Sequence, residues 1–270
     1  MILSTFFHHI LQPVRRGTMT PQECAEFCLS LGITGIDVMP CAPVREPEDI
    51  LQIFLQSGMC LCSMPAHWDI LHGADPGTAD TVLKTAERLG VRNVLIIPGF
   101  FEDGDDRSEV VARSLEPFAA FCRRAASMGI TPAMESFDHV ASPLLHTEGL
   151  LYYLSQIPEL TCTFDMGNAY YSGEDVTDAF RRLRPYIKEQ IHCKDRLPPS
   201  PDAAWEQGSP RPTPDTAVGD GVVPIASILH ELTADGFDGV ISLEHYGAED
   251  QAASLTRSAA YVRNVLRQDQ

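Results

Sequence analysis

The sequence predicts a single-domain α/β protein of the (β/α)8 TIM barrel class. Eight short apolar runs are typical of strands, and helical patterns closed by glycine separate several of them. An alternating order of strands and helices favours parallel strands, and eight strands favour a closed barrel; an open, doubly wound sheet is the alternative. A length of 270 residues with 44% hydrophobic content suits one large core, so we expect one domain over 1–270.

The expected strands are short apolar runs bounded by turn residues. In chain order they are Ile2–Phe6, Gly35–Val38, Cys60–Met64, Asn93–Ile97, Thr131–Glu135, Thr161–Asp165, Glu189–His192 and Gly239–Glu244. From the fifth strand to the seventh, the spacing between strand ends leaves room for one helix and two short loops, which is the repeat of a barrel.

Start and stop residues mark three of the helices between these strands. Thr20 precedes Pro21, an arrangement that suits a capping residue followed by proline in the first turn. That helix is predicted to end at Gly32, and Gly90 and Gly129 are expected to end two later helices. An apolar strand follows each of the three glycines, which supports the alternating order.

One connection is longer than the others and lies between the seventh and eighth expected strands. Its Pro-rich part, about 197–218, holds six prolines between Pro198 and Pro214, which forbid a regular helix. In a barrel this insertion would lie beside the mouth, where Trp205 could cover a ligand; a plain surface loop is the alternative. The segment VGDGVVP is predicted to turn at its glycines, and Pro224 to open the last long helix.

Charge and hydropathy argue against two classes of partner. The formal net charge of -17 would repel phosphate backbones and anionic lipid, so neither nucleic acid nor a membrane is an expected partner. No stretch approaches the ~20 apolar residues of a membrane span, and the first residues lack the basic flank and cleavage site of a secretion signal. The eight cysteines are scattered without a CxxC pair, which favours reduced thiols. We therefore expect a cytoplasmic protein.

The segment EQIHCKD carries the clearest chemical signal. On a strand His192 and Lys194 face the same side, and three other apolar runs each end in a carboxylate, namely Glu135, Asp165 and Glu244. A single acid at a strand end is more often a loop cap or an ion-pair partner. Four successive strands that each deliver a metal-capable side chain instead predict a metal site at the mouth of a barrel.

Three carboxylates and one imidazole form a hard, anionic ligand set. Such a set suits one divalent ion, Mn²⁺ above all, with Mg²⁺, Co²⁺ or Zn²⁺ as alternatives. Glu135 and Glu244 would approach from different sides of the mouth and flank a bound substrate. Because a metal that holds a carbonyl and a neighbouring hydroxyl oxygen acidifies the C–H bond between them, two flanking carboxylates could move that proton. The product would be an epimer or an aldose/ketose isomer.

Four segments carry a resemblance to a known family: AMESFDH, TFDMGNAYYSGED, QIHCKDR and VGDGVVP…GFDGVISLEHYG. Over essentially the whole chain the sequence resembles the xylose isomerase-like TIM barrel superfamily, in particular the sugar phosphate isomerase/epimerase group with ketose 3-epimerases, hydroxypyruvate isomerases and inosose dehydratases. The resemblance implies a single divalent metal held by Glu135, Asp165, His192 and Glu244, with Glu135 and Glu244 as the catalytic, proton-transferring pair. It also implies a homo-oligomer, either a dimer or a tetramer.

The sequence departs from the epimerase pattern at some positions. Those members tend to carry a histidine three residues after the strand 6 aspartate and an arginine six after the strand 7 histidine, where this chain has Asn168 and Pro198. Arg196, with Lys194 beside it, is the candidate substitute, and His67 after the third strand is a candidate substrate contact. The predicted substrate-binding residues are therefore His67, Asn168, Lys194 and Arg196.

Other polar residues near the expected mouth have no assigned role. Asp37 ends the second strand, where many relatives have glutamate, and Asp138 lies where the chain turns after the fifth strand. Only one of His8 and His9 can point inward after the first strand. The departures from the family pattern at Asn168, Pro198 and Asp37 leave the expected metal ligands intact and leave the identity of the sugar open.

The sequence thus predicts a metal-dependent isomerase or epimerase of a small sugar, sugar phosphate or hydroxy-keto acid, acting by proton transfer next to a carbonyl. The alternative at the same site is a dehydratase of a keto-cyclitol or related substrate. A DNA-repair nuclease of the endonuclease IV type shares the superfamily, but it would need three zinc ions, more mouth histidines and a basic groove. The net charge of -17 argues against it. A non-catalytic metal-binding regulator is the remaining rival.

Overall fold

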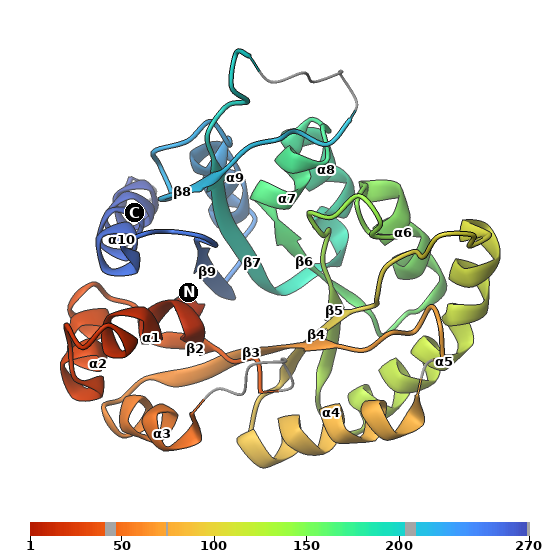
Figure 1. The fold of residues 1–270 in the computed structure, drawn as a ribbon, viewed down its shortest axis with the longest axis horizontal. Helices are drawn as coiled ribbons and strands as arrows, with labels where there is room; N and C mark the ends of the chain where they lie inside the picture. The colour runs from red at the N-terminus through yellow and green to blue at the C-terminus, as the bar shows by residue number, and fades with distance from the viewer. Residues whose placement is uncertain (41–46, 74, 203–208, 269–270) are drawn as a thin grey trace.

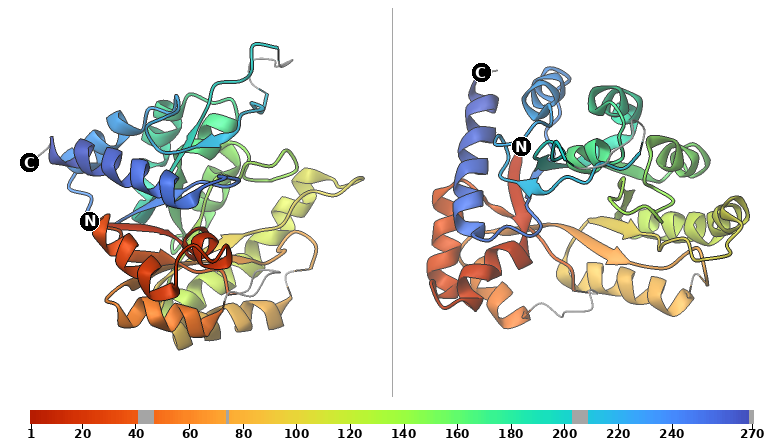
Figure 2. Two further views of the ribbon diagram at one scale, coloured as in Figure 1. Left: turned by 60° about the vertical axis from the view of Figure 1, so that its left-hand side comes forward. Right: turned by 45° about the horizontal axis from the view of Figure 1, so that its top comes forward.

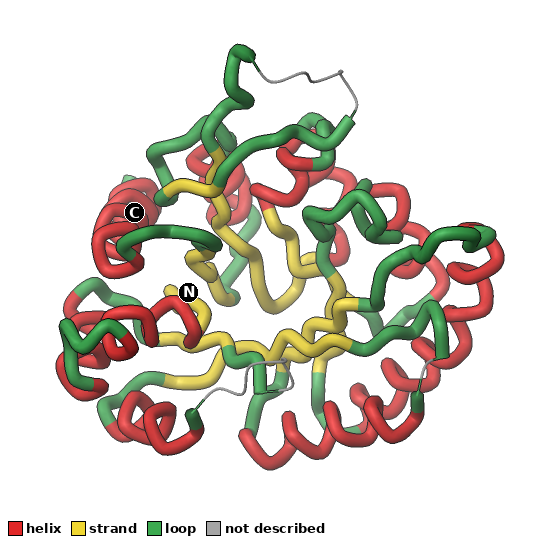
Figure 3. The backbone as a smooth tube through the Cα atoms, in the orientation of Figure 1, coloured by secondary structure: helices red, strands yellow, loops and turns green. Residues whose placement is uncertain are grey.

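The chain folds into a closed barrel of eight parallel strands surrounded by helices, and the computed structural model describes residues 1–40, 47–73, 75–202 and 209–268. Figure 1 looks into the barrel, and Figure 3 shows the strands as an inner ring with the helices outside it. The strands are β1 (Ile2–Phe6), β2 (Gly35–Asp37), β3 (Cys60–His67), β4 (Asn93–Ile97), β5 (Thr131–Met134), β6 (Thr161–Asp165), β7 (Ile187–Arg196), β8 (Asp215–Thr216) and β9 (Val240–Glu244).

The helices of the described residues follow the strands along the outside of the barrel. They are α1 (Phe7–Arg15), α2 (Pro21–Ser30), α3 (Glu48–Gln56), α4 (Pro76–Leu89), α5 (Arg107–Ser127), α6 (Thr147–Gln156), α7 (Met166–Tyr171), α8 (Val176–Leu183), the short 3₁₀ helix η1 (Arg184–Tyr186), α9 (Ile225–Ala234) and α10 (Gln251–Arg267). Among these ranges no helix combines the length and apolar character needed to span a membrane.

Strand pairing closes the barrel. Neighbouring strands pair in the order β1 to β7, then β9, and β9 returns to β1, with every one of these pairs parallel. This confirms the predicted single-domain TIM barrel and contradicts the open sheet. The short β8 stands apart, because it pairs antiparallel with the end of β7. It was not predicted, and β3 and β7 both extend further than expected, to His67 and Arg196.

Helix boundaries follow local signals in the sequence. At the start of α2 the Thr20 hydroxyl accepts a hydrogen bond from the Glu23 backbone N–H, and the Glu23 carboxylate accepts one from the Thr20 N–H. α4 ends at Gly90, whose φ of 71° lies in the left-handed region that glycine adopts without strain. Pro224 directly precedes α9 as predicted, but α10 is the last long helix.

The described parts of the segment after β7, residues 197–202 and 209–214, lie at the mouth of the barrel. Figure 2 shows this segment at one end of the barrel and both chain termini at the other. The N–H of Leu197 donates to the Pro214 carbonyl at 3.1 Å, and the N–H of Arg211 donates to the Tyr171 carbonyl at 2.7 Å. Trp205, the candidate lid residue, lies outside the described residues.

The predicted glycine turn after this segment is present and completes the end of β7. The Asp195 carboxylate accepts hydrogen bonds from the backbone N–H groups of Gly219, Gly221 and Val223 at 2.9 to 3.1 Å. Gly219 has a φ of 96°, which a residue with a Cβ rarely adopts. The GDG sequence is therefore a turn that binds a side chain of its own protein.

The cysteines of the described residues are free thiols, and Cys41 lies outside that part of the chain. Five of them are buried: Cys24, Cys28, Cys122, Cys162 and Cys193. This agrees with the prediction of reduced thiols, although Cys60 is exposed and Cys62 only half-buried.

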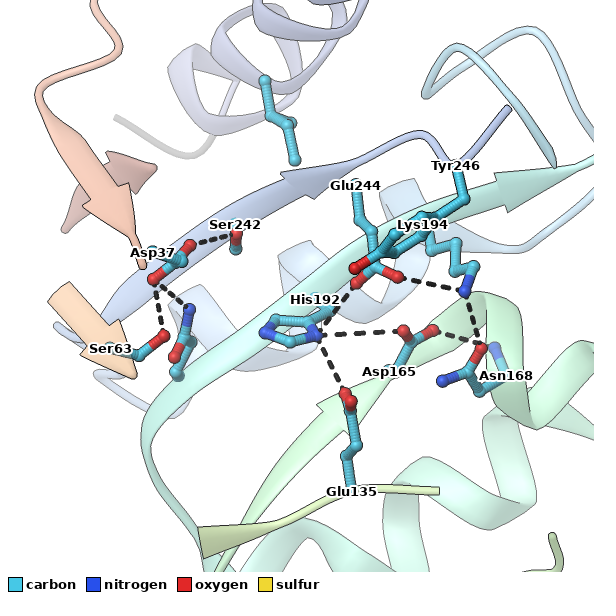
Figure 4. A network of polar contacts seen from close by, with 12 residues as sticks. Asp37, Ser63, Glu135, Asp165, Asn168, His192, Lys194, Ser242, Glu244 and Tyr246 are labelled. Carbon is cyan, nitrogen blue, oxygen red and sulfur yellow. Dashed lines mark hydrogen bonds and ion pairs between the residues drawn. The ribbon is translucent and has the colours of Figure 1, made fainter. Parts of the chain in front are cut away.

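A polar layer lies inside the barrel around the buried carboxylate of Asp37. The carboxylate accepts hydrogen bonds from the hydroxyls of Ser4, Ser63 and Ser242 and from the amide of Gln190, at 2.5 to 3.0 Å. Figure 4 shows the contacts with Ser63 and Ser242. All five side chains are at most 1% exposed. Asp37 therefore faces the interior of the barrel and stabilises it.

Replacing Asp37 by Ala is expected to lower the free energy of unfolding by about 3 kcal/mol, because four buried donors lose their acceptor. Urea unfolding of the metal-free protein would measure the change. The exposed Asp103→Ala is the matched control, with an expected change within about 0.5 kcal/mol. A loss no larger than that of the control would show that the polar layer does not stabilise the barrel.

Candidate metal centre and active site

Four strand ends bring the predicted ligands together at the mouth of the barrel. Asp165 of β6 and His192 of β7 are register partners, and Glu244 at the end of β9 pairs with Lys194 of β7. Glu135 directly follows β5. The four ligand candidates are between 0% and 7% exposed. The parallel order of the strands is what places these side chains at one end of the barrel.

The imidazole of His192 is the centre of this cluster (Figure 4). Its Nδ1 atom lies 2.9 Å from Glu135 Oε2, 3.1 Å from Glu244 Oε2 and 3.8 Å from Asp165 Oδ2. None of these four buried atoms has a hydrogen bond of good geometry within the described part of the chain. One N–H can satisfy at most one of the three carboxylates, so the others are left unpaired, which is rare for buried polar groups.

The unpaired atoms fit a divalent cation. Ligand atoms of Glu135, Asp165 and His192 all lie within 4.8 Å of one another, so one ion could contact all three. Glu244 adjoins this set through His192, while its other oxygen, Oε1, lies 3.0 Å from Nζ of Lys194. Carboxylates with an imidazole are typical ligands of first-row divalent ions. The residues present therefore fit the expected metal, and Lys194 competes for one oxygen of Glu244.

Burial and charge shift the protonation of the cluster in the metal-free protein. Burial raises the pKa of Glu135 to about 7, and the charge of His192 opposes this shift. Burial would also raise the pKa of Glu244, but the Lys194 ammonium and the contact with His192 hold it below its ordinary value. Burial would lower the pKa of His192, but the surrounding carboxylates raise it well above its ordinary value. The imidazole of the metal-free protein is therefore protonated at neutral pH.

Metal binding is consequently expected to strengthen as the pH rises. A ligating imidazole must be neutral, so below the raised pKa of His192 each ion displaces at least that proton. The apparent dissociation constant should fall about tenfold per pH unit for each proton released. Calorimetric titration near neutral pH in two buffers of different ionisation enthalpy would count the protons. An affinity that does not change with pH would contradict this assignment.

A cavity of about 370 Å³ adjoins the cluster. Its polar lining residues are His67, Glu135, Asp138, Asn168, Lys194 and Glu244, and its apolar ones are Phe6, Met39, Pro65, Ile97, Phe137 and Tyr246. The volume lies at the small end of the range for small-molecule sites. Such a cavity suits a compact molecule that has several polar groups on one side.

Three of the four predicted substrate-binding residues line this cavity: His67, Asn168 and Lys194. The Asn168 amide donates to the Ser136 carbonyl at 2.8 Å, and its side-chain oxygen accepts from Lys194 Nζ at 3.0 Å. Partial burial lowers the pKa of His67 at the end of β3. Asn168 is therefore fixed on both sides, whereas His67 is the more exposed of the three.

Arg196 takes a different position from the one predicted. It does not line the cavity, and it is only 3% exposed. Its Nε donates to the Gly167 carbonyl and its Nη1 to the Thr213 carbonyl, both at 2.9 Å. The same guanidinium also pairs with the carboxylates of Asp138 and Asp215. From outside the cavity, the arginine thus connects the backbone at Gly167 and Thr213 with the carboxylates of Asp138 and Asp215.

Three further residues join the site that sequence reasoning did not assign to it. Asp138 accepts from Lys194 Nζ at 3.0 Å, Asp215 lies 4.0 Å from the same atom, and the ring centroid of Tyr246 lies 5.2 Å from it. The sequence held a signal for Tyr246, because alternation places it on the same face as Glu244. Asp215 comes from the Pro-rich insertion, where no pattern fixes the position of a side chain.

The two adjacent histidines after β1 support Tyr246. The ring of His8 lies 5.2 Å from the Tyr246 ring and that of His9 lies 5.1 Å from it, measured between centroids. His9 is 2% exposed, and its Nε2 accepts a hydrogen bond from the His245 N–H at 3.2 Å. Neither histidine lines the cavity.

Comparison with known proteins identifies the fold. A family model described as "Xylose isomerase-like TIM barrel" matches residues 60–265, whereas no curated protein matches significantly. One similar structure is the probable 3-DHS dehydratase AsbF of Bacillus anthracis, with 18% identity, a TM-score of 0.74, and coverage of 98% of this chain and 99% of that one. The IOLI protein with a bound zinc atom has 15% identity, a TM-score of 0.74 and coverage of 100% and 99%. A D-tagatose 3-epimerase-like protein has 15% identity, a TM-score of 0.72 and coverage of 100% and 98%.

Proposed function

Because the chain belongs to the xylose isomerase-like TIM barrel family, we propose that it is a divalent-metal-dependent isomerase or epimerase of a small carbohydrate. The observation that carries the proposal is the set of buried carboxylate and imidazole atoms without hydrogen-bond partners, next to a cavity of about 370 Å³. The similar structures include an epimerase-like protein and a dehydratase, which supports enzymatic chemistry at this kind of site without fixing the reaction.

The proposed metal ligands are Glu135, Asp165, His192 and Glu244. Three carboxylates with a single imidazole favour Mn²⁺ as the working ion, with Mg²⁺, Co²⁺ or Zn²⁺ able to occupy the same ligands. When bound, the ion supplies Lewis-acid polarisation of a substrate carbonyl, which makes the neighbouring C–H bond more acidic.

Glu135 and Glu244 are the proposed proton-transferring pair. They reach the site from β5 and β9 and lie 2.9 and 3.1 Å from the same imidazole nitrogen of His192 (Figure 4). One carboxylate removes the proton from the carbon next to the carbonyl. Return of a proton by the other carboxylate to the opposite face of the same carbon gives an epimer. Return of the proton to the former carbonyl carbon, with the hydroxyl proton passing from one oxygen to the other, gives an aldose/ketose isomer.

His67, Asn168 and Lys194 are the proposed substrate contacts. Lys194 donates to Asn168 and pairs with Glu244, both at 3.0 Å, so it keeps the side-chain amide and the catalytic carboxylate in fixed positions. Arg196 is proposed as a positioning residue, because it holds Asp138 against the same lysine from outside the cavity.

Proton NMR in D₂O tests the proposal directly. The protein is loaded with Mg²⁺ or Co²⁺ and incubated with a panel of ketoses, hydroxy-keto acids and cyclitol ketones. We expect one substrate C–H signal to disappear as the product forms, and no change after treatment with a chelator. Product without deuterium would point to a hydride shift or an internally returned proton. No reaction with any compound would contradict the proposed enzyme activity.

A dehydratase is the second candidate, and Tyr246 is the observation that favours it. The residue lines the cavity with its ring centroid 5.2 Å from Nζ of Lys194, and a phenol is protonated at neutral pH because its ordinary pKa is about 10. The phenol therefore keeps a proton that it could give to a departing hydroxide while a glutamate removes the α-proton, which releases water and forms a C=C bond. The absorbance of a conjugated enone product would distinguish this reaction from epimerisation.

We also propose that the enzyme works in the cytoplasm as a homo-oligomer, a dimer or a tetramer. The free buried cysteines support a reducing compartment. Light scattering on the purified protein would test the oligomeric state, and a monomer at all concentrations would contradict it.

A further inference from the structure

Two cations lie at the polar part of the site, Lys194 in the lining of the cavity and Arg196 outside it, and both are already paired with carboxylates of the protein. Lys194 and Arg196 both pair with Asp138, and both face Asp215, at 4.0 Å for the lysine and 3.0 Å for the arginine. The positive charges of Lys194 and Arg196 are therefore balanced by the carboxylates of Asp138 and Asp215 before any substrate binds.

Lys194 has no N–H left for a substrate anion. Its Nζ lies 3.0 Å from each of three oxygens, Asp138 Oδ2, Asn168 Oδ1 and Glu244 Oε1, and an ammonium has three N–H groups. The side chain is only 3% exposed. A phosphate or carboxylate could reach this ammonium only by displacing one of these partners.

Arg196 likewise has no free N–H group directed at a substrate. Its guanidinium is shared among two backbone carbonyls and two carboxylates, and it lies outside the cavity. A substrate anion would therefore find no unpaired cation among the described residues that line the cavity.

The remaining charges of the site also disfavour the binding of an anion. Three further carboxylates, those of Glu135, Asp165 and Glu244, stand at the metal site and outnumber the two charges of a divalent ion. Asp138 also lines the cavity, and no described residue donates to its Oδ1 atom, which leaves that oxygen free to accept a hydrogen bond from a hydroxyl group.

From this balance we infer that the substrate is an uncharged polyhydroxy ketone or aldehyde, without a phosphate or carboxylate group, and that Asp138 enforces the choice. Asp138 accepts a hydrogen bond from a hydroxyl group of the neutral substrate. It repels an anionic substrate, because its carboxylate occupies the place beside Lys194 that the anion would need. The inference rests on the proposed function, since it names the substrate class of the same site.

Matched substrate pairs test the inference. Free ketoses and their phosphate esters are compared by C–H exchange and by binding to the metal-loaded protein. We expect the free ketose to bind and react at least about tenfold better than its ester. A preference of the unchanged protein for the phosphorylated member would overturn the inference and leave the proposed isomerase standing. Loss of C–H exchange with every pair would instead count against the proposed function.

A second measurement does not depend on finding the substrate. Inorganic phosphate is titrated against the metal-loaded protein and the melting temperature is recorded. Asp138→Asn keeps the size of the side chain but releases the charges of Lys194 and Arg196, so phosphate should stabilise this variant more than the unchanged protein. Asp215→Asn should shift the response in the same direction, which covers the case in which the first variant folds poorly. The exposed Asp103→Asn is the control. Equal stabilisation of all four proteins by phosphate would overturn the role of Asp138.

Discussion

Replacing Glu135 by Gln is expected to lower the rate of substrate C–H exchange by roughly 10²–10⁴-fold, because the amide cannot accept the proton that a carboxylate removes. The side chain is 8% exposed and lies 2.9 Å from His192, so the isosteric change should leave the barrel folded. Exchange is measured by proton NMR in D₂O with substrate in excess. The exposed Glu87→Gln on α4 is the matched control and should exchange at the normal rate.

Metal content must be measured on the same samples, because Glu135 is also a proposed ligand. A variant that keeps its ion and loses exchange assigns the proton transfer to Glu135. A variant that loses both shows that the carboxylate is needed first to hold the ion. A variant that keeps its ion and most of its exchange activity would remove Glu135 from the mechanism.

The fold and the cluster of ligand candidates could be predicted from the sequence because both follow from a short-range pattern. Apolar runs that end in Glu135, Asp165, His192 and Glu244 need only a parallel barrel to bring their ends together, and the alternating order of elements predicts that barrel. No precise knowledge of loops is needed for this step.

The wall of the cavity could not be predicted because it depends on loops and on competition between side chains. Alternation along β7 correctly put Lys194 on the side of His192, but the same rule could not show that Arg196 would turn to the Gly167 carbonyl. Asp215 reaches the site through β8, which pairs with only two residues of β7 and follows a Pro-rich segment. The sequence therefore suggested Arg196 as a substrate contact, whereas the structure ties it to carboxylates of the protein.

Replacing His192 by Ala is expected to weaken metal binding by at least about 100-fold, because the imidazole lies at the centre of the ligand set and supplies its one nitrogen ligand. The change also leaves three buried carboxylates close together without the imidazole between them. Nearby like charges disfavour ionisation, so these acids should take up protons in the metal-free variant. Those protons then compete with the ion for the carboxylates.

Calorimetric titration with Mn²⁺ and the metal content after dialysis would measure this loss. The exposed His146→Ala is the matched control, because it removes an imidazole that lies outside the cavity and should bind Mn²⁺ normally. In the His192 variant the imidazole proton no longer contributes, so the remaining rise of affinity with pH should report protons that the ion displaces from the three carboxylates. Tight binding of Mn²⁺ by His192→Ala would show that the ion sits elsewhere, and the assignment of the metal centre would have to be abandoned.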